Sequence, residues 1–439
     1  MTALLLVLFL GAALWMIVWG ITKPDRYYQL PTITGAVWLL YLGPMAIGIY
    51  NNRDWLPDGV VQDGGIEMAL LMSFLCCVAT LVGYIGFYKP EHHKDREVSE
   101  YSDERVFLCG VVFLLMGYWA FFQLAALSGG IMTYFSVEGA YQLEWEGIPV
   151  LYHFFSQLVY PGLVLCLFAY LNRPDPMRFW VVLFGLAMPF ANVILRGRRG
   201  ELAIVMVILG FCFFFRKRWA PPRSLVIAFL CFGAFAVLAA PVYRAHSQLG
   251  GDSSEIWNIS AEKLLTDMLS GHEYTEFHYP VIQLPATFQE NEYNYGRGFY
   301  NRFVRQWVPK LIVGQETKDA LFWPGPNFKL HTVEYYGWLP QKGWIPTAIV
   351  DVFQEFSFFG AFMFMGFAMA YRRLWERAMA GDMGVQIFYV ALAPSAMFAI
   401  VSGLTAFFAQ LLYLLLFLLP ILWFCRVGKN EAAQVRYAT

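Results

Sequence analysis

Long apolar segments recur along almost the whole chain, and they constrain its fold more than any other feature. A helix needs about 20 apolar residues to cross a lipid bilayer. Composition agrees, because 58% hydrophobic and only 14% charged residues exclude an ordinary soluble domain. The sequence therefore predicts an all-α integral membrane protein with about 11 transmembrane helices. The eleven segments run from Thr2 to Ile21, Ile33 to Tyr50, Ile66 to Phe87, Val106 to Leu127, Val150 to Leu171, Phe179 to Leu195, Leu202 to Phe215, Ser224 to Tyr243, Trp344 to Tyr371, Val385 to Val401 and Leu404 to Cys425.

Lys and Arg residues gather in alternate connections between these segments, which predicts their orientation. Eighteen of them lie on one face, within 23–26, 89–105, 173–178, 216–223, 372–377 and 426–436. Because cytoplasmic loops collect positive charge, this face is predicted to be the cytoplasmic one. The N-terminus is then outside and the C-terminus inside. No basic region precedes the first apolar run, which we therefore expect to be a retained helix and not a cleaved signal peptide.

One long hydrophilic segment on the outer face divides the chain into three parts. Residues 1–243 hold membrane helices 1–8, residues 244–343 form a large outer (periplasmic) insertion, and residues 344–439 hold helices 9–11 and a short cytoplasmic tail. Apolar residues recur at helical spacing early in the insertion, which predicts an amphipathic helix at the membrane surface. These residues are Ala261, Leu264, Leu265, Met268 and Leu269.

A short loop between the sixth and seventh segments breaks the charge rule. Its sequence, Arg196-Gly197-Arg198-Arg199-Gly200-Glu201, places three arginines on the outer face. Planar guanidinium groups bind phosphate and pyrophosphate well, and the loop leads into a helix N-terminus that favours an anion. Glu201 would account for only one of the three charges by pairing. Arg196, Arg198 and Arg199 are therefore predicted to bind a pyrophosphate.

A second basic group lies late in the insertion. Arg302, Arg305 and Pro309 fall near one face of a predicted helix. The two arginines are predicted to face the same pyrophosphate, and the alternative is an anchor to anionic lipid headgroups.

Aromatic residues are spread over the same hydrophilic insertion. Rings with an apolar face and a polar tip suit a bound carbohydrate, whereas an interfacial aromatic belt is the alternative. The candidates for stacking on sugars are Tyr279, Tyr295, Tyr300 and Trp307.

Titratable side chains of the outer face supply candidates for a general base. His272 and Glu273 are favoured, because they directly follow the amphipathic helix and would lie at the membrane surface. Asp351 and Glu355 lie four residues apart on one face of the ninth segment, as supporting residues or as partners for the arginines. The sequence contains no Walker A, HExxH, GxSxG or Asp-x-Asp pattern. We expect no metal and no cofactor.

Three motifs together resemble the Wzy-type polymerases, the family that polymerises O-antigen and oligosaccharide repeat units. The first is the junction Arg196-Gly197-Arg198-Arg199-Gly200. The second runs from Gly298-Phe299-Tyr300 to Pro309-Lys310. The third combines Pro346, Asp351 and the stretch from Glu355 to Gly360, with Glu in place of Asn and Ser in place of the first Gly.

The resemblance implies a metal-independent glycosyltransferase that works on the outer face of the membrane. A glycan on undecaprenyl pyrophosphate would be passed to another lipid-linked repeat unit. The arginines would bind the pyrophosphate, His272 or Glu273 would deprotonate the acceptor, and the aromatic residues would bind sugars. The expected partners are the lipid-linked oligosaccharide, membrane lipid and a chain-length regulator protein, with no nucleic acid.

Other functions stay open at this point. An O-antigen ligase uses a similar donor with a different acceptor. A metal-dependent glycosyltransferase would employ acids of an early outer loop, namely Asp54, Asp58 and Asp63. A flippase or transporter of lipid-linked oligosaccharide is a further alternative, although transporters tend to carry repeated halves and interrupted helices at the midplane.

Overall fold

The computed structural model describes residues 1–54, 56–87, 99–135, 148–196, 199–233, 235, 266, 276–308, 310–339 and 346–427. These residues are predominantly helical, and within them extended pairing is limited to an isolated bridge between Tyr101 and Arg426. The all-α expectation is confirmed for this part of the chain.

Nine helices in the described ranges are long and apolar enough to cross a membrane. Each coincides with a segment predicted from the sequence. In chain order they are Thr2–Ile21 (α1), Leu30–Asn51 (α2, Leu30–Val37, and α3, Gly43–Asn51), Gly65–Gly86 (α5, Gly65–Leu81, with a π-helical turn), Asp103–Leu127 (α6), Ile148–Asn172 (α9, Ile148–Ser156, and α10, Val159–Asn172), Pro176–Leu195 (within α11, Pro176–Arg196), Ala348–Met379 (α20, Ala348–Phe356, and α21, Ala361–Met379), Met383–Ser402 (α22) and Leu404–Cys425 (α23).

Two of the eleven predicted segments are not among these nine. The seventh forms α12, Arg199–Lys217, whose apolar part is shortened by Glu201 at one end and by Arg216 and Lys217 at the other. The eighth begins as the shorter apolar helix Arg223–Gly233, and most of its remaining residues lie outside the described ranges.

The ninth predicted segment is interrupted instead of continuous. Helix α20 ends at Phe356, a 3₁₀ turn covers Ser357–Gly360, and α21 then begins at Ala361. The break occurs at Ser357, whose φ of 53° lies in the left-handed region that an α-helix cannot use. The consequence is that α20 is a short, separately oriented helix that carries Asp351 and Glu355.

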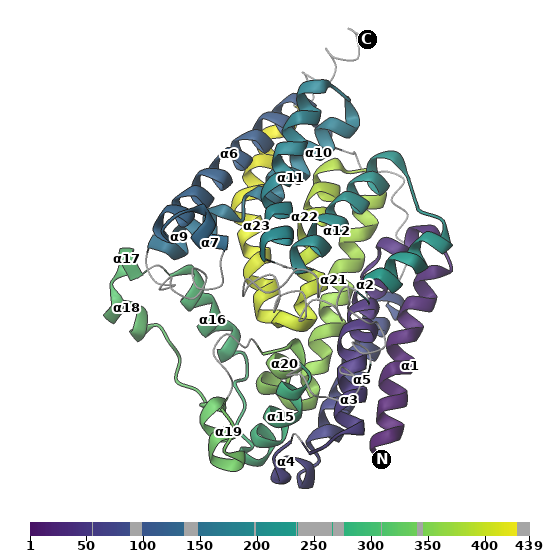
Figure 1. The fold of residues 1–439 in the computed structure, drawn as a ribbon, viewed down its shortest axis with the longest axis vertical. Helices are drawn as coiled ribbons and strands as arrows, with labels where there is room; N and C mark the ends of the chain where they lie inside the picture. The colour runs from purple at the N-terminus through teal and green to yellow at the C-terminus, as the bar shows by residue number, and fades with distance from the viewer. Residues whose placement is uncertain are drawn as a thin grey trace.

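The start of α1 and the end of α23 lie at opposite ends of the helical bundle. Figure 1 places the N-terminus beside the short helix α4, Asp58–Gln62, on the side of α15 and α19, whereas the carboxyl end of α23 lies at the far end. We call the first the amino-terminal end. Helices α15 and α19, which belong to the described part of the predicted insertion, thus lie at the same end of the bundle as the N-terminus. Which end faces the cytoplasm stays a prediction.

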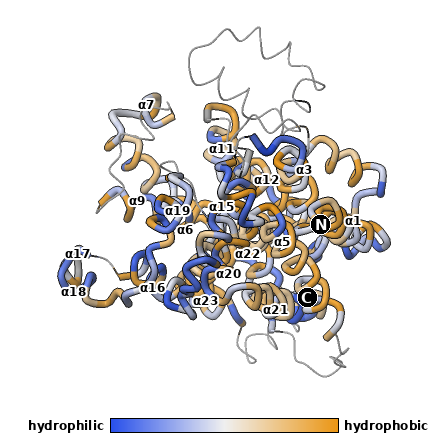
Figure 2. Tube along the Cα trace, turned by 90° about the horizontal axis from the view of Figure 1, so that it is seen from below, coloured by the Kyte–Doolittle hydropathy of each residue, from blue (hydrophilic) through white to orange (hydrophobic). Residues whose placement is uncertain are grey.

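The described part of the insertion consists of short helices. Helix α15 packs against α5 and α20, and all residues from His278 to Thr287 in it are buried. Viewed from the amino-terminal end, hydrophilic residues concentrate on α16 and α18, whereas α1 and α5 are largely hydrophobic (Figure 2). The helices of this region are α15 (His278–Glu290), α16 (Arg297–Trp307), α17 (Lys310–Val313), α18 (Gln315–Ala320) and α19 (Phe328–Tyr336). The predicted amphipathic helix at 261–269 lies outside the described residues apart from Thr266.

Candidate functional site

Two buried carboxylates of α20 organise the amino-terminal end of the bundle. Asp351 is 8% exposed and Glu355 is 3% exposed. A buried carboxylate is costly unless several donors satisfy it. Each of the two accepts hydrogen bonds at the N-terminus of a different helix, Glu355 at α16 and Asp351 at α23. We call this arrangement the carboxylate corner: Asp351, Glu355 and the first turns of α16 and α23.

Glu355 fixes the start of α16. Its Oε2 accepts from the backbone N–H of Gly296 at 2.7 Å, and its Oε1 accepts from the Asn294 side-chain amide at 3.3 Å. The backbone N–H of Gly298 also donates to this carboxylate. The approach is so close that a Cβ at residue 298 would overlap the carboxylate, which explains a glycine there. A negative charge at a helix N-terminus is electrostatically favourable.

Asp351 plays the corresponding part for α23. Its Oδ2 accepts from the Thr405 hydroxyl at 2.6 Å and from the Thr405 backbone N–H at 3.2 Å. Gly403, which precedes α23 with a φ of 89°, lies against the same carboxylate, where a Cβ would overlap Oδ2. The guanidinium of Arg302 is near enough to interact electrostatically with Asp351. The two carboxylates predicted as supporting residues are therefore anchors for helix N-termini.

Side chains of α16 and the loop before it hold this helix in place. Arg297 donates to three backbone carbonyls, those of Tyr293, Asn294 and Pro324, each at 2.9 Å. The side chain of Asn301 makes two hydrogen bonds with the backbone of Trp323. Its Nδ2 donates to the Trp323 carbonyl oxygen at 2.8 Å, and its Oδ1 accepts from the Trp323 N–H at 2.9 Å. Sequence reasoning assigned no role to Arg297 or Asn301. The partners at Trp323 and Pro324 are backbone groups more than twenty residues away, and no sequence pattern marks such contacts.

The predicted pyrophosphate-binding arginines of α16 differ in their surroundings. Arg302 is half-buried beside Asp351, whereas Arg305 is exposed. An edge-to-face contact between Phe299 and Phe408, with ring centroids 5.7 Å apart, packs α16 on α23. This contact and the Glu355 anchor hold the backbone that positions Arg302.

The junction between α11 and α12 reaches the same region. Arg196 ends α11 and Arg199 begins α12, while Arg198 lies outside the described residues. Gly200, next to Arg199, lies against the ring of Phe398 in α22, with 3.4 Å between an ideal Cβ position and Cζ. Phe398 is five residues before Gly403, a rise of about 7.5 Å along a helix. The start of α12 therefore lies close to the corner where α22 ends and α23 begins.

The four predicted sugar-binding aromatic residues occupy different environments. Tyr295 is 67% exposed, and Tyr300 stacks on Trp323 with ring centroids 4.6 Å apart. Trp307 packs edge-to-face against Phe154 of α9 at 5.6 Å. Tyr295 and, beside Tyr300, the 54% exposed Trp323 thus offer accessible aromatic surfaces in this region.

The fourth of these residues, Tyr279, is buried near the carboxylate corner. It is 4% exposed and lies edge-to-face with Trp338, at 5.7 Å between ring centroids. Burial, and to a smaller extent the negative charge of Asp351, raise the pKa of Tyr279 to about 12. Its hydroxyl therefore keeps its proton at neutral pH and remains a hydrogen-bond donor.

The predicted general bases His272 and Glu273 lie outside the described residues. Of the early acids considered for a metal-dependent transferase, Asp63 accepts a 2.8 Å hydrogen bond from the Tyr336 hydroxyl, which ties α4 to α19. Glu201, at the start of α12, accepts a hydrogen bond from Tyr160 in α10. Glu201 thus has a partner in the described part of the chain that is not an arginine.

The fold and the composition together define a multi-pass helical membrane protein with a polar, partly buried site at one end of its bundle. Comparison with protein-family models, with curated proteins and with solved structures found no match for this chain.

Proposed function

We propose that this protein transfers glycan from a lipid pyrophosphate carrier to another lipid-linked repeat unit, as a metal-independent polysaccharide polymerase at the outer face of the cytoplasmic membrane. The observation that carries the proposal is that two arginine-bearing segments are held by elements of this region, α22 and the carboxylate corner. One is the start of α12, placed by Gly200 against Phe398, and the other is α16, placed by Glu355.

Arginine side chains would bind the anion in this proposal. The first turns of α16 and α23 each already receive a carboxylate, whose negative charge opposes the binding of a phosphate there. Arg302 and Arg305, together with the arginines at 196, 198 and 199, would supply the positive charge. Guanidinium groups suit a pyrophosphate, because their planar forks donate two parallel hydrogen bonds and keep their charge at any accessible pH.

The proposed reaction needs one leaving group and one base. An acceptor hydroxyl oxygen attacks the anomeric carbon of the donor sugar, and the bond from that carbon to the pyrophosphate oxygen breaks. The electron pair passes to the pyrophosphate, whose growing charge the arginines stabilise. The hydroxyl proton passes to His272 or Glu273 in this proposal. Tyr295 and the Tyr300–Trp323 pair would offer stacking surfaces to the sugars.

Binding of lipid phosphates tests the anion site. We expect the purified protein in lipid nanodiscs to bind undecaprenyl pyrophosphate at least about tenfold more tightly than undecaprenyl monophosphate, because the second phosphate engages a further arginine. Arg302→Ala should reduce this preference, whereas Lys329→Ala, which removes an exposed cation of α19, should retain it. Equal affinity for the two lipids would contradict a pyrophosphate site.

A ligase and a transporter of the same lipid would also bind the pyrophosphate. The product distinguishes them, since only a polymerase lengthens the lipid-linked glycan when no other acceptor is present. The interrupted helix α20–α21 is a feature shared with transporters, but its break lies beside helix anchors at one end of the bundle.

A further inference from the structure

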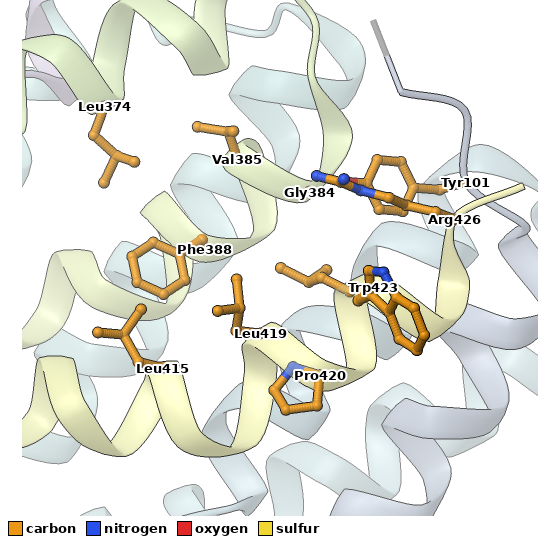
Figure 3. A pocket seen from close by; sticks show the side chains of 11 residues that line it. Tyr101, Leu374, Gly384, Val385, Phe388, Leu415, Leu419, Pro420, Trp423 and Arg426 are labelled. Carbon is orange, nitrogen blue, oxygen red and sulfur yellow. The ribbon is translucent and has the colours of Figure 1, made fainter.

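An apolar groove lies at the opposite end of the bundle from the carboxylate corner. It has a volume of about 550 Å³ and is formed by α21, α22 and α23. Leu415 and Phe388 stand at one end of it, and Tyr101 and Arg426 stand at the other (Figure 3). Trp423, on the rim, is 76% exposed. The groove therefore opens to the surroundings of the helices, which in a membrane are lipid chains.

The polar end of the groove is held together by the backbone. Tyr101 and Arg426 form an antiparallel bridge, supported by hydrogen bonds from Ser102 N to Cys425 O at 3.0 Å and from Val427 N to Glu100 O at 2.9 Å. The Nε of Arg426 donates to the Tyr101 hydroxyl at 3.2 Å. Among the described residues, the two terminal nitrogens of Arg426 make no hydrogen bond. The two terminal nitrogens of Arg426, which can donate hydrogen bonds, are thus held at the mouth of an apolar groove.

Charge at this end favours an anion. Arg105 lies next to Arg426, with its Nη1 3.5 Å from the Arg426 carbonyl oxygen. Asp382 interacts electrostatically with Arg426, and its carboxylate accepts from the Val385 backbone N–H at 3.1 Å. Two more acids close to Tyr101 in the chain, Asp103 and Glu104, each lie 3.9 Å from Arg173, and the guanidinium of Arg426 would attract a phosphate.

The length of the groove matches one leaflet of a bilayer. From Leu415 to Arg426 the chain advances eleven residues, a rise of about 16 Å in a helix. Half of the hydrocarbon core of a membrane measures about 15 Å. Arg426 is the first residue beyond α23, where headgroups begin, and the groove below it is lined by apolar side chains. These dimensions fit one acyl chain with its phosphate at Arg426.

We propose that this groove binds an anionic phospholipid of the adjacent leaflet, with one acyl chain between α22 and α23 and the phosphate on Arg426 and the Tyr101 hydroxyl. This site is separate from the proposed glycan-transfer site and does not depend on that function. A bound lipid would link residues 99–102 to the end of α23 and so stabilise the contact between them.

Native mass spectrometry of the purified, delipidated protein tests the proposal, with equal amounts of phosphatidylglycerol and phosphatidylcholine added. We expect the protein to retain phosphatidylglycerol in preference. Arg426→Ala should lower that preference about fivefold, the effect of one arginine near an anionic lipid. Leu419→Trp, which fills the groove, should reduce retention of both lipids. Lys217→Ala, which removes an exposed cation at the end of α12, is the matched control.

Three outcomes would overturn the proposal. The first is equal retention of the two lipids by the unmodified protein. The second is an Arg426→Ala variant that behaves like Lys217→Ala. The third is a dimer that Leu419→Trp dissociates, since a second copy of the chain would then occupy the groove. An unchanged thermal unfolding midpoint in Leu419→Trp would show that this variant still folds.

Discussion

Replacing Arg302 with alanine is expected to slow glycan extension about a hundredfold, because a preorganised donor to a developing anion contributes about that much. Arg302 is the arginine whose surroundings are best defined, since α16 is anchored by Glu355 and Asp351 lies beside the guanidinium. The measurement is the initial rate at which purified protein lengthens a lipid-linked repeat unit. Arg302→Lys keeps the charge but loses the planar fork, and we expect about a tenfold loss.

Two matched variants separate this effect from a general loss of charge. Arg305→Ala removes an exposed arginine three residues further along α16 and should slow extension less than Arg302→Ala does. Lys329→Ala removes an exposed cation of α19 and should leave the rate unchanged. A rate for Arg302→Ala equal to that of Lys329→Ala would remove Arg302 from the site. The thermal unfolding midpoint of each variant reports whether the fold is retained.

Replacing Glu355 with alanine is expected to lower the free energy of unfolding by about 3 kcal/mol. The substitution leaves the half-buried backbone N–H groups of Gly296 and Gly298 without this acceptor, and a fully buried donor without a partner costs about 1–3 kcal/mol. Glu355→Gln keeps one acceptor oxygen and should cost about half as much. Thermal unfolding in detergent measures the loss, and hydrogen exchange should show faster exchange of the α16 amides.

The control for this prediction is Glu316→Ala, which removes an exposed carboxylate of α18 in the same region of the chain. It should leave both the unfolding midpoint and the exchange of α16 unchanged. If Glu355→Ala behaves as Glu316→Ala does, Glu355 does not anchor α16, and the account of how Arg302 is positioned is wrong.

The membrane helices could be predicted because their signal is local. The first segment, Thr2 to Ile21, and the last, Leu404 to Cys425, have the same bounds in the structure as in the prediction. The break at Ser357 could not be predicted, because the residues around it are as apolar as an unbroken span requires. It depends on one left-handed residue and on distant partners, the backbone of residues 294 and 295, which pair with the end of α20.

In the candidate site too, local features could be predicted from the sequence and contacts between distant residues could not. Spacing alone placed Asp351 and Glu355 on one face of a helix and predicted helix α16 around Arg302. Each of the two carboxylates contacts a helix N-terminus because of where α16 and α23 start in space. No sequence pattern predicts that position. The hydrogen bond that Glu201 accepts from Tyr160, forty-one residues earlier in the chain, could likewise not be predicted from the sequence. The roles of Arg198, His272 and Glu273 remain predictions, since these residues lie outside the described ranges.

Reaction of the purified protein with a lipid-pyrophosphate-linked repeat unit in the presence of EDTA is the most direct test of the proposed function. We predict a ladder of longer lipid-linked glycans from the unmodified chain and none from Arg198→Ala or Arg199→Ala, since these arginines would bind the departing pyrophosphate. A lipid-linked substrate that the unmodified protein leaves unchanged would contradict the polymerase and point to ligation or transport of the same lipid.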